Sequence, residues 1–405
     1  MFIAFRTTGG FGGIMLSKTV PLWISESAPP NVRGAMSQFH GSAVDFGYLL
    51  AGYVGVGFFL HVNAATDNAW RGPQAIGILF CLPLLAGLYW VPESPRYLLM
   101  KGRNEDATAV VRFMHSKKGE TNHYYADAEL YQMQRQIELD RTLPSTWLDM
   151  FRRPTYRKRT LMAIFLVFIL QATGAQILTI YATIIFGNLG YDSTKQLLLQ
   201  AGLFAVMWPI STSAIFYMDK FPRNRLVATG LGGMTAMLII YTALTAQFLG
   251  TSNAAGQAAA AAFIYLFFAC YVATVEGPFY YYVAELFPTH LRAKGMTLQA
   301  STFCWTSILW AQSGPVAIAH IGWRLFLVFI ILSACGTVII WFFYPDTNKK
   351  TLEEIAEFFG DADEVVVYQR DIHMNAVTHE ISGPEKSQSD TEAAHLEQVH
   401  PTKSI

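Results

Sequence analysis

Long apolar stretches, separated by short polar segments, make up most of the chain. A run of about 20 apolar residues is enough for a helix to cross the hydrocarbon core of a bilayer. The pattern therefore predicts an all-α integral membrane protein with nine transmembrane helices. The predicted spans are Phe2–Glu26, Ala35–Leu60, Trp70–Val91, Leu161–Leu189, Leu197–Met218, Leu226–Leu249, Ala258–Glu285, Met296–His320 and Trp323–Tyr344.

The polar segments divide the chain into four predicted regions. Residues 1–100 form a partial N-terminal transmembrane half with three helices, and residues 159–345 form a C-terminal half with six. Residues 101–158 form a polar loop between the two halves. Residues 346–405 form a tail, which we expect to be largely disordered after about residue 371 because it becomes rich in Ser, Glu and His.

The polar loop predicts both surface helices and an orientation. Residues 105–115 and 127–139 have amphipathic patterns typical of short helices at a membrane surface. The segment from Arg96 to Arg159 carries a high density of Lys and Arg. Because basic residues collect in loops on the cytoplasmic side, we expect this loop and the tail to be cytoplasmic. We expect the membrane to be the plasma membrane.

Composition excludes several classes of function. Charged residues are only 14% of the chain, against about 25% in soluble domains, and the 29 basic and 29 acidic residues cancel. A nucleic-acid partner would need a basic face, so none is expected. The four Cys lie in apolar runs without CxxC spacing, so no metal or cofactor is expected. With no nucleophile motif or phosphate loop, the sequence does not predict an enzyme.

A motif occurs twice in the same order. Glu26 and Glu285 each end a predicted helix, a Pro follows three residues later, and Arg33 and Arg292 follow seven residues later. Two spans after each copy, a Pro precedes an acidic residue, at Glu93 and at Asp346. Internal repeats of this kind are typical of transporter folds.

Four further motifs carry a resemblance to a known family. The stretches are PESPRYLL (92–99), DKFPRN (219–224), YVAELFPTHLRAKG (282–295) and PDTNKKTLEE (345–354). Together they resemble the sugar porter family of the major facilitator superfamily, in the manner of fungal hexose and disaccharide permeases. The resemblance covers nearly everything from Phe2 to Gly360. It implies a major facilitator fold, a sugar substrate, alternating access, the lipid bilayer as surroundings and a monomer.

The resemblance also implies that family helices one to three are absent from this chain. The second copy of the repeat is preceded by three helices and the first copy by none. The acidic residue that serves as proton acceptor on helix one of proton-coupled members is absent as well, which leaves proton symport and facilitated diffusion open. We expect the chain as given to be inactive, with an incomplete gene model as the simplest cause.

Charged residues at the predicted helix ends suggest a gate. The repeat favours a network that closes the cytoplasmic end in one conformation, over isolated interface anchors. Arg6, which resembles the family's helix-four Arg, is the member away from those ends. The expected members are Arg6, Glu26, Arg33, Glu93, Arg96, Asp219, Arg223, Glu285, Arg292 and Asp346.

Polar and aromatic residues inside the spans suggest a substrate site. Gln171, Gln176 and Tyr181 fall in a stretch that resembles the family's helix-seven motif, and amides suit sugar hydroxyls because they both donate and accept. Tyr280 and Trp305 lie where the family carries Trp residues. We expect these five residues and Asp45 to line one cavity, where flat aromatic rings would contact the C–H faces of a sugar: Gln171, Gln176, Tyr181, Tyr280, Trp305 and Asp45.

Several roles stay open at this stage. Asp45 binds sugar hydroxyls, carries a proton, or bonds to a neighbouring helix. His40 suits a helix contact better than a ligand, and Glu276 suits a cap on exposed backbone at a helix break. The substrate is also open, because Leu170, Gly41 and Gln176 depart from the family pattern. A permease for quinate, inositol or another polyol, and a nutrient sensor on a transporter fold, are the alternatives.

Overall fold

The computed structural model describes residues 2–28, 33–62, 68–115, 124–251, 253–348, 350, 352–360, 373–374 and 381–382. Almost every described residue in a regular element is helical. The helices are α1 (Phe2–Ser27), α2 (Arg33–His61), α3 (Asn68–Gly87), α4 (Pro95–Met100), α5 (Asn104–His115), α6 (Tyr124–Thr142), α7 (Trp147–Arg152), α8 (Pro154–Gln171), α9 (Ala175–Ile180), α10 (Ala182–Asn188), α11 (Ser193–Ala214), η1 (Met218–Lys220), α12 (Arg223–Phe248), α13 (Ala254–Thr274), α14 (Glu276–Leu286), α15 (Thr289–Ile321), η2 (Gly322–Arg324), α16 (Leu325–Phe343) and α17 (Leu352–Phe359). Two short strands, β1 (His373–Met374) and β2 (Ile381–Ser382), pair antiparallel.

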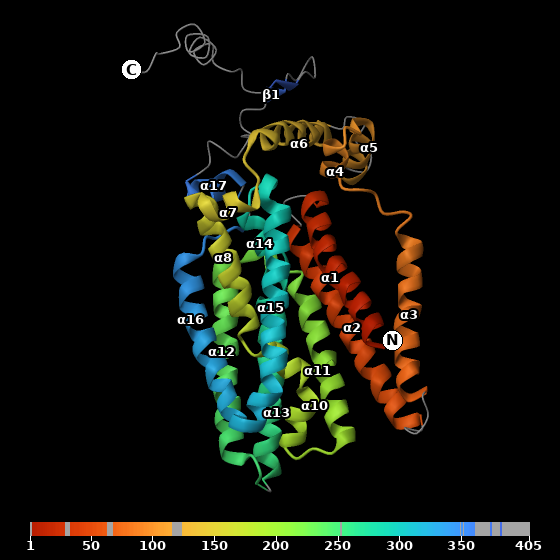
Figure 1. The fold of residues 1–405 in the computed structure, drawn as a ribbon, viewed down its shortest axis with the longest axis vertical. Coiled ribbons are helices and arrows are strands. Elements are labelled where there is room, and N and C mark those ends of the chain that lie inside the picture. Colours follow the sequence, from red (N-terminus) through yellow and green to blue (C-terminus); the bar gives the residue numbers. More distant parts are fainter. Residues whose placement is uncertain are drawn as a thin grey trace. The chain divides into compact units, whose positions relative to one another are not determined.

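The chain forms two compact units. The larger unit holds residues 1–94 and 144–364, and the smaller holds residues 95–143 and 365–405. In the larger unit the long helices run alongside one another as a bundle (Figure 1). The predicted four-region division stays a prediction. Most of the predicted disordered tail lies outside the described residues.

The core of the larger unit is built by the helices after residue 154. Phe186, Phe267, Phe268 and Phe329 are at most 1% exposed and belong to one apolar cluster. Close approach of the helices depends on small residues, as is usual in membranes. A Cβ at Gly230 of α12 would overlap the side chains of Thr274 and Val275, so α12 packs tightly on the α13–α14 junction.

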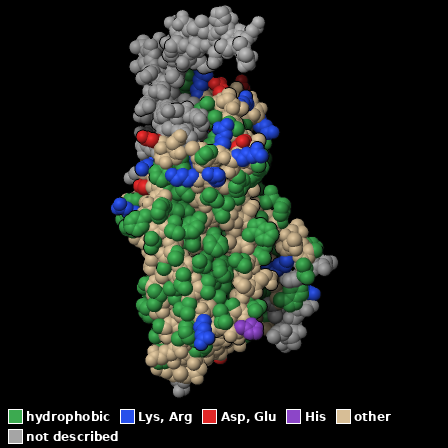
Figure 2. Space-filling model, turned by 60° about the vertical axis from the view of Figure 1, so that its left-hand side comes forward, with side chains coloured by type: hydrophobic (Ala, Val, Ile, Leu, Met, Phe, Trp, Pro, Cys, Tyr) green, Lys and Arg blue, Asp and Glu red, His purple; other side chains and the backbone are tan. Residues whose placement is uncertain are grey.

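Apolar side chains also cover the outside. Phe11 of α1 is 67% exposed and Ile331 of α16 is 62% exposed. Figure 2 shows one face on which a broad field of hydrophobic side chains contains few charged ones. Water does not favour such a surface, whereas hydrocarbon does.

Six stretches among the described residues are long and apolar enough to cross a membrane. They are Gly34–His61, Pro154–Ile180, Ser193–Ala214, Arg223–Phe248, Ala254–Leu286 and Thr289–Phe343. The last contains both α15 and α16, and neither α1 nor α3 is among the six. Helical segments occupy most of each of the nine predicted spans, but the number of transmembrane helices is not confirmed as nine.

Two long helices are interrupted near their middles. The first break follows α8, where Gly174 adopts a φ of +85° before α9 begins. The second separates α13 from α14 at Val275, next to Glu276, Gly277 and Pro278. Backbone irregularity at membrane depth is tolerated where it lines a cavity, and it is where transporters place their binding groups. Both breaks bring polar side chains to the centre of the bundle.

The smaller unit contains the predicted amphipathic segments. They form α5 and α6, which pack with α4 through a small core that includes Leu98, Val111 and Met133. The Arg112 guanidinium donates to both carboxylate oxygens of Asp127, at 2.9 and 3.1 Å, and joins α5 to α6. The apolar faces of these helices therefore meet one another.

Candidate functional site

A cavity of about 430 Å³ lies in the larger unit. Its volume is within the range of about 300–1,000 Å³ that is usual for small-molecule sites. Side chains from α1, α2, α8, α9, α11, α13, α14 and α15 line it. The polar lining residues are Ser17, Lys18, His40, Asp45, Tyr48, Gln171, Gln176, Thr179, Tyr271, Glu276 and Tyr280.

Four of the six predicted substrate residues line this cavity: Gln171, Gln176, Tyr280 and Asp45. On a continuous helix, residues five apart would point about 140° away from each other. The break at Gly174 separates Gln171 from Gln176 and lets both reach the same space. The Oε1 atom of Gln176 accepts a hydrogen bond of 3.0 Å from the Ser307 hydroxyl of α15.

The structure does not bring the other two predicted residues to the cavity. The Tyr181 hydroxyl donates to the Ala311 carbonyl at 2.7 Å, so it ties the junction between α9 and α10 to α15. The Trp305 side chain is 73% exposed. The position of a residue in a motif does not state which face of its helix turns inward.

Two buried carboxyl groups meet beside the cavity. Asp45 of α2 is 1% exposed and Glu276 of α14 is 4% exposed, and their carboxyl groups are neighbours, although the Asp45 oxygens have no hydrogen-bond partner among the described residues. The Ser211 hydroxyl donates to Oε2 of Glu276 at 3.2 Å. Within the described residues, no basic side chain donates to the oxygens of Asp45. Two neighbouring buried carboxylates repel each other when both are charged.

The sequence left Glu276 with an open role because the pair exists only when α2 and α14 meet. Gly41 lies one turn before Asp45 on α2 and faces α14. A Cβ at Gly41 would lie 3.6 Å from the Glu276 side chain and 3.6 Å from the Tyr280 ring, which is ordinary van der Waals contact. A glycine followed four residues later by an acid was the signal available in the sequence.

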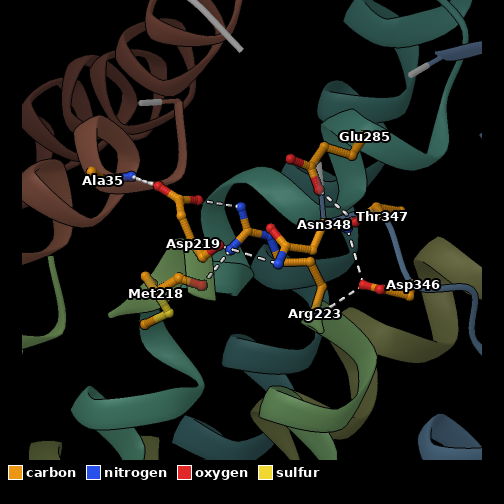
Figure 3. A network of polar contacts seen from close by, with 8 residues as sticks. All are labelled: Ala35, Met218, Asp219, Arg223, Glu285, Asp346, Thr347 and Asn348. Carbon is orange, nitrogen blue, oxygen red and sulfur yellow. Dashed lines mark hydrogen bonds and ion pairs between the residues drawn. The ribbon is translucent and has the colours of Figure 1, made fainter. Parts of the chain in front are cut away.

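A second polar cluster consists of Asp219, Arg223, Asp346 and Asn348 (Figure 3). We call it the Asp219 cluster. The guanidinium of Arg223, in a side chain 4% exposed, donates to Oδ1 of Asp219 at 2.5 Å. The backbone N–H groups of Arg223 and Asn348 donate to Oδ1 of Asp346 at 2.9 and 3.0 Å. The cluster thus joins the start of α12 to the segment after α16.

The Asp219 cluster also holds the start of α2. Oδ2 of Asp219 accepts a hydrogen bond of 2.9 Å from the backbone N–H of Ala35 (Figure 3). An added Cβ at Gly34 would overlap the Asp219 carboxylate. Glycine at this position of the repeat therefore allows the close approach of the two segments.

Each copy of the repeat forms the same pair of contacts. Oε2 of Glu26 accepts from the Ser94 hydroxyl at 2.5 Å, and Oε2 of Glu285 accepts from the Thr347 hydroxyl at 2.6 Å. Three residues before each Glu an aromatic residue donates to a proline carbonyl. The Trp23 indole donates to Pro92 at 3.1 Å, and the Tyr282 hydroxyl donates to Pro345 at 2.5 Å. The repeat is therefore a structural one.

The remaining predicted gate residues are dispersed. Nε of Arg292 donates to the Ala284 carbonyl at 3.1 Å. Arg6 and Glu93 are exposed, and Arg96 lies in the first turn of α4 in the smaller unit. The side chain of Arg33 lies outside the described residues.

The sequence reasoning missed Arg159. It is 1% exposed, its Nη1 donates to the Leu286 carbonyl at 2.7 Å, and its guanidinium lies 4.1 Å from the Phe359 ring. In the sequence it reads only as part of a basic loop. No local signal distinguishes this buried arginine from its exposed neighbours.

Comparison with known proteins places the chain in a family. The family model described as "Sugar (and other) transporter" matches residues 1–359. The MFS-type transporter criB of Aspergillus cristatus is 29% identical over 364 residues, covering 89% of this chain and 73% of the relative. The high-affinity glucose transporter of Kluyveromyces lactis is 26% identical over 381 residues, covering 89% and 68%.

A solved structure shows the same fold. The proton:xylose symporter XylE, solved with 6-bromo-6-deoxy-D-glucose bound, matches with a TM-score of 0.76 at 24% identity, covering 88% of this chain and 74% of that one. XylE is a major facilitator superfamily protein, so the all-helical bundle has the major facilitator architecture. The family model matches nearly all described residues, which decides the family to which the chain belongs. The chain belongs to the sugar (and other) transporter family, whose members are membrane transporters and not enzymes.

Proposed function

We propose that the protein moves a sugar across the membrane by alternating access, with the cavity as its substrate site. The observation that carries this proposal is the meeting of Gln171 and Gln176 across the break at Gly174. Two amides offer donors and acceptors to neighbouring hydroxyls of one ring. Glucose and fructose transporters among the relatives support a hexose-like substrate.

Conformational exchange follows from where the cavity lies. Side chains of α1 and α2 form one wall, and side chains of α8, α9 and α15 form another. If these groups of helices rock against each other around the site, the substrate is exposed to one side of the membrane at a time. The protein acts in this proposal as a monomer in the plasma membrane, with its basic loop and its tail in the cytoplasm.

Proton coupling is a second element of the proposal. The Asp45–Glu276 pair joins α2 to α14, and a shared proton makes that junction stable. Loss of the proton leaves two charges that repel, which favours separation of the helices. The pair therefore favours proton symport over facilitated diffusion.

Two other functions have some support. A quinate permease of Neurospora africana is 27% identical over 376 residues, which keeps a cyclic polyol acid among the candidate substrates. A nutrient sensor on the same fold would bind a sugar without moving it. Sensing and transport differ in one measurement, which is accumulation of label inside a vesicle.

The experiment measures binding and uptake by the purified chain. Isothermal titration in lipid nanodiscs with a panel of hexoses, pentoses and polyols gives affinities, and proteoliposomes give uptake of the labelled ligand. Gln171→Ala and Gln176→Ala should each weaken binding by about 1–3 kcal/mol, because a buried hydroxyl of the sugar loses its partner. Gln247→Ala, on an exposed part of α12, is the matched control. Unchanged affinity in both cavity variants would refute the site.

A further inference from the structure

Lys18 is a cation inside the cavity that the proposed sugar chemistry does not use. It lies on α1 and lines the cavity. Its ammonium lies 5.0 Å from the centre of the Phe279 ring and 5.4 Å from that of Phe303. It forms no ion pair with any side chain in the described part of the chain.

The position of Lys18 makes this lack of a counterion unusual. An ionisable side chain within a membrane span is costly, and it normally pairs with an opposite charge or serves a substrate pathway. Lysines near helix ends avoid the cost by reaching toward the interface. The contacts with Phe279 of α14 and Phe303 of α15 show that Lys18 reaches inward instead. Phenyl faces replace only part of the hydration that an ammonium group loses.

The other charged groups of the cavity do not satisfy Lys18. Asp45 and Glu276 also line the cavity, but neither forms an ion pair with Lys18 among the described residues, and Glu276 accepts a hydrogen bond from Ser211. His40, edge-on to Tyr280 with ring centres 5.0 Å apart, has an Nε2 atom without a hydrogen-bond partner among the described residues. Lys18 and His40 therefore bring nitrogen atoms to a cavity in which Asp45 and Glu276 are the carboxyl groups among the described lining residues. The titratable groups that complete the lining are Tyr48 and Tyr271.

We infer that the cavity is built for a polyhydroxylated carboxylate, a sugar acid, whose carboxylate pairs with Lys18 while its hydroxyl groups meet Gln171 and Gln176. This inference rests on the proposed function, because it takes the same cavity as the transport site. A single lysine suits a carboxylate with one charge. A phosphate ester would call for several donors or an arginine fork, and no arginine lines the cavity among the described residues.

Matched ligand pairs test the inference. D-Glucuronate and D-glucose share a ring and differ only in the carboxylate, and D-galacturonate and D-galactose form a second pair. Titration of the purified chain in nanodiscs should give tighter binding of the acid in at least one pair. Lys18→Gln should weaken binding of that acid about ten- to hundredfold, the range for a hydrogen bond to a charged group, and should change the neutral sugar by less than about threefold.

Two further variants control the experiment. Lys18→Arg keeps the charge and should retain most of the preference for the acid. Lys195→Gln removes a lysine that pairs with Asp192 at 3.2 Å on the exposed start of α11, and it should change neither ligand. Monodisperse elution and an unchanged melting temperature establish that each variant is folded.

The outcomes separate this inference from the proposed function. If glucose binds in a manner that depends on Gln171 but neither acid is preferred, or if Lys18→Gln weakens acid and neutral sugar equally, the sugar-acid inference is overturned and the sugar site stands. If no ligand of either pair binds, both are overturned. Acid binding that is lost in Lys18→Gln, retained in Lys18→Arg and Lys195→Gln, and weakened in Gln171→Ala supports both.

Discussion

Asp45 and Glu276 show how two side chains become a functional unit only in three dimensions. Each is nearly inaccessible, at 1% and 4% exposed, and the two carboxyl groups are neighbours. The Gln38 amide supports the arrangement by donating to the Ser211 carbonyl at 3.0 Å, which positions the serine that contacts Glu276. In the proposed coupling, this pair binds and releases one proton.

Neutral substitutes should separate proton coupling from sugar exchange. In Asp45→Asn and Glu276→Gln, a permanent amide hydrogen replaces the shared proton, so binding and release of that proton no longer change the contact. We expect accumulation driven by a pH gradient to fall by tenfold or more, while counterflow of labelled sugar without a gradient stays within a few-fold of the wild type. Both are measured in proteoliposomes.

The matched control is Asp192→Asn, which changes an exposed acid outside the predicted spans. Asp192 pairs with Lys195, and that contact holds the pKa of its carboxyl below the usual value. This variant should leave both transport modes unaltered. Wild-type accumulation in both cavity variants would rule out the pair as the proton site.

Individual site residues differ in how much the sequence reveals about them. Gln171, Gln176 and Asp45 are recognisable because polar groups are rare in apolar spans. Trp305 has an equally favourable motif position but is 73% exposed. Lys18 has no signal of this kind in the sequence, since its contacts with Phe279 and Phe303 depend on α14 and α15. Tertiary contact, which one sequence does not contain, decides these cases.

Helix breaks are the feature of the elements that matters most for the site. The predicted span Leu161–Leu189 becomes α8, α9 and α10, and the predicted span Ala258–Glu285 becomes α13 and α14. The length of an apolar run predicts that a helix crosses the membrane. That length is the same for a straight helix and for a broken one, so it does not reveal the break. Gly174 and the Gly277-Pro278 pair mark the breaks, although glycines elsewhere in the spans serve packing instead.

Gly174→Ala should disturb both stability and the site. Alanine at a φ of +85° is strained, and its Cβ would lie 2.8 Å from Cδ2 of Phe329. We expect a loss of about 1–3 kcal/mol in stability, seen as a lower melting temperature. Sugar affinity should fall as well, because the break sets the relative directions of Gln171 and Gln176.

Gly322→Ala distinguishes strain from a change in the site. Gly322 also has a positive φ, +53°, but no atom lies within 4 Å of its added Cβ, and it does not line the cavity. This control should lower the melting temperature and leave the affinity for sugar unchanged. Equal loss of affinity in the two variants would mean that the break has no special role in binding.

At the scale of the whole molecule, the repeat predicted from the sequence corresponds to repeated contacts. The sequence suggests that charges of the two halves pair with each other, and this stays a prediction. Glu26 and Glu285 each accept a hydrogen bond from a hydroxyl of their own copy, Ser94 and Thr347. The spacing of the motif is sufficient to find the repeat. The hydrogen-bond partner of each Glu depends on where the chain lies after the next two helices, which the spacing does not state. The contact that joins α2 to η1 runs through a backbone N–H, which no residue pattern marks.

That contact makes the Asp219 cluster the candidate for a gate. Asp219 binds both the Ala35 N–H and the Arg223 guanidinium, so its charge holds the start of α2 against the start of α12 (Figure 3). Arg223 is also fixed by the Met218 carbonyl at 2.6 Å and by the Tyr281 ring at 4.7 Å. Arg223 is therefore expected to stay in place when α2 moves. Asp219 is the residue of the cluster that can release the start of α2.

Asp219→Asn should release the start of α2. An amide bonds the Ala35 N–H and the buried guanidinium more weakly than a carboxylate does, by about 1–3 kcal/mol, and a change of that size shifts a two-state equilibrium by roughly ten- to hundredfold. Hydrogen exchange followed by mass spectrometry should therefore show faster exchange in peptides that contain residues 34–40, together with slower uptake of sugar. Asp106→Asn, which breaks an exposed pair with Arg103 in the smaller unit, should alter neither. Unchanged exchange at 34–40 in Asp219→Asn would show that this cluster fixes the fold of α12 without holding the two segments together.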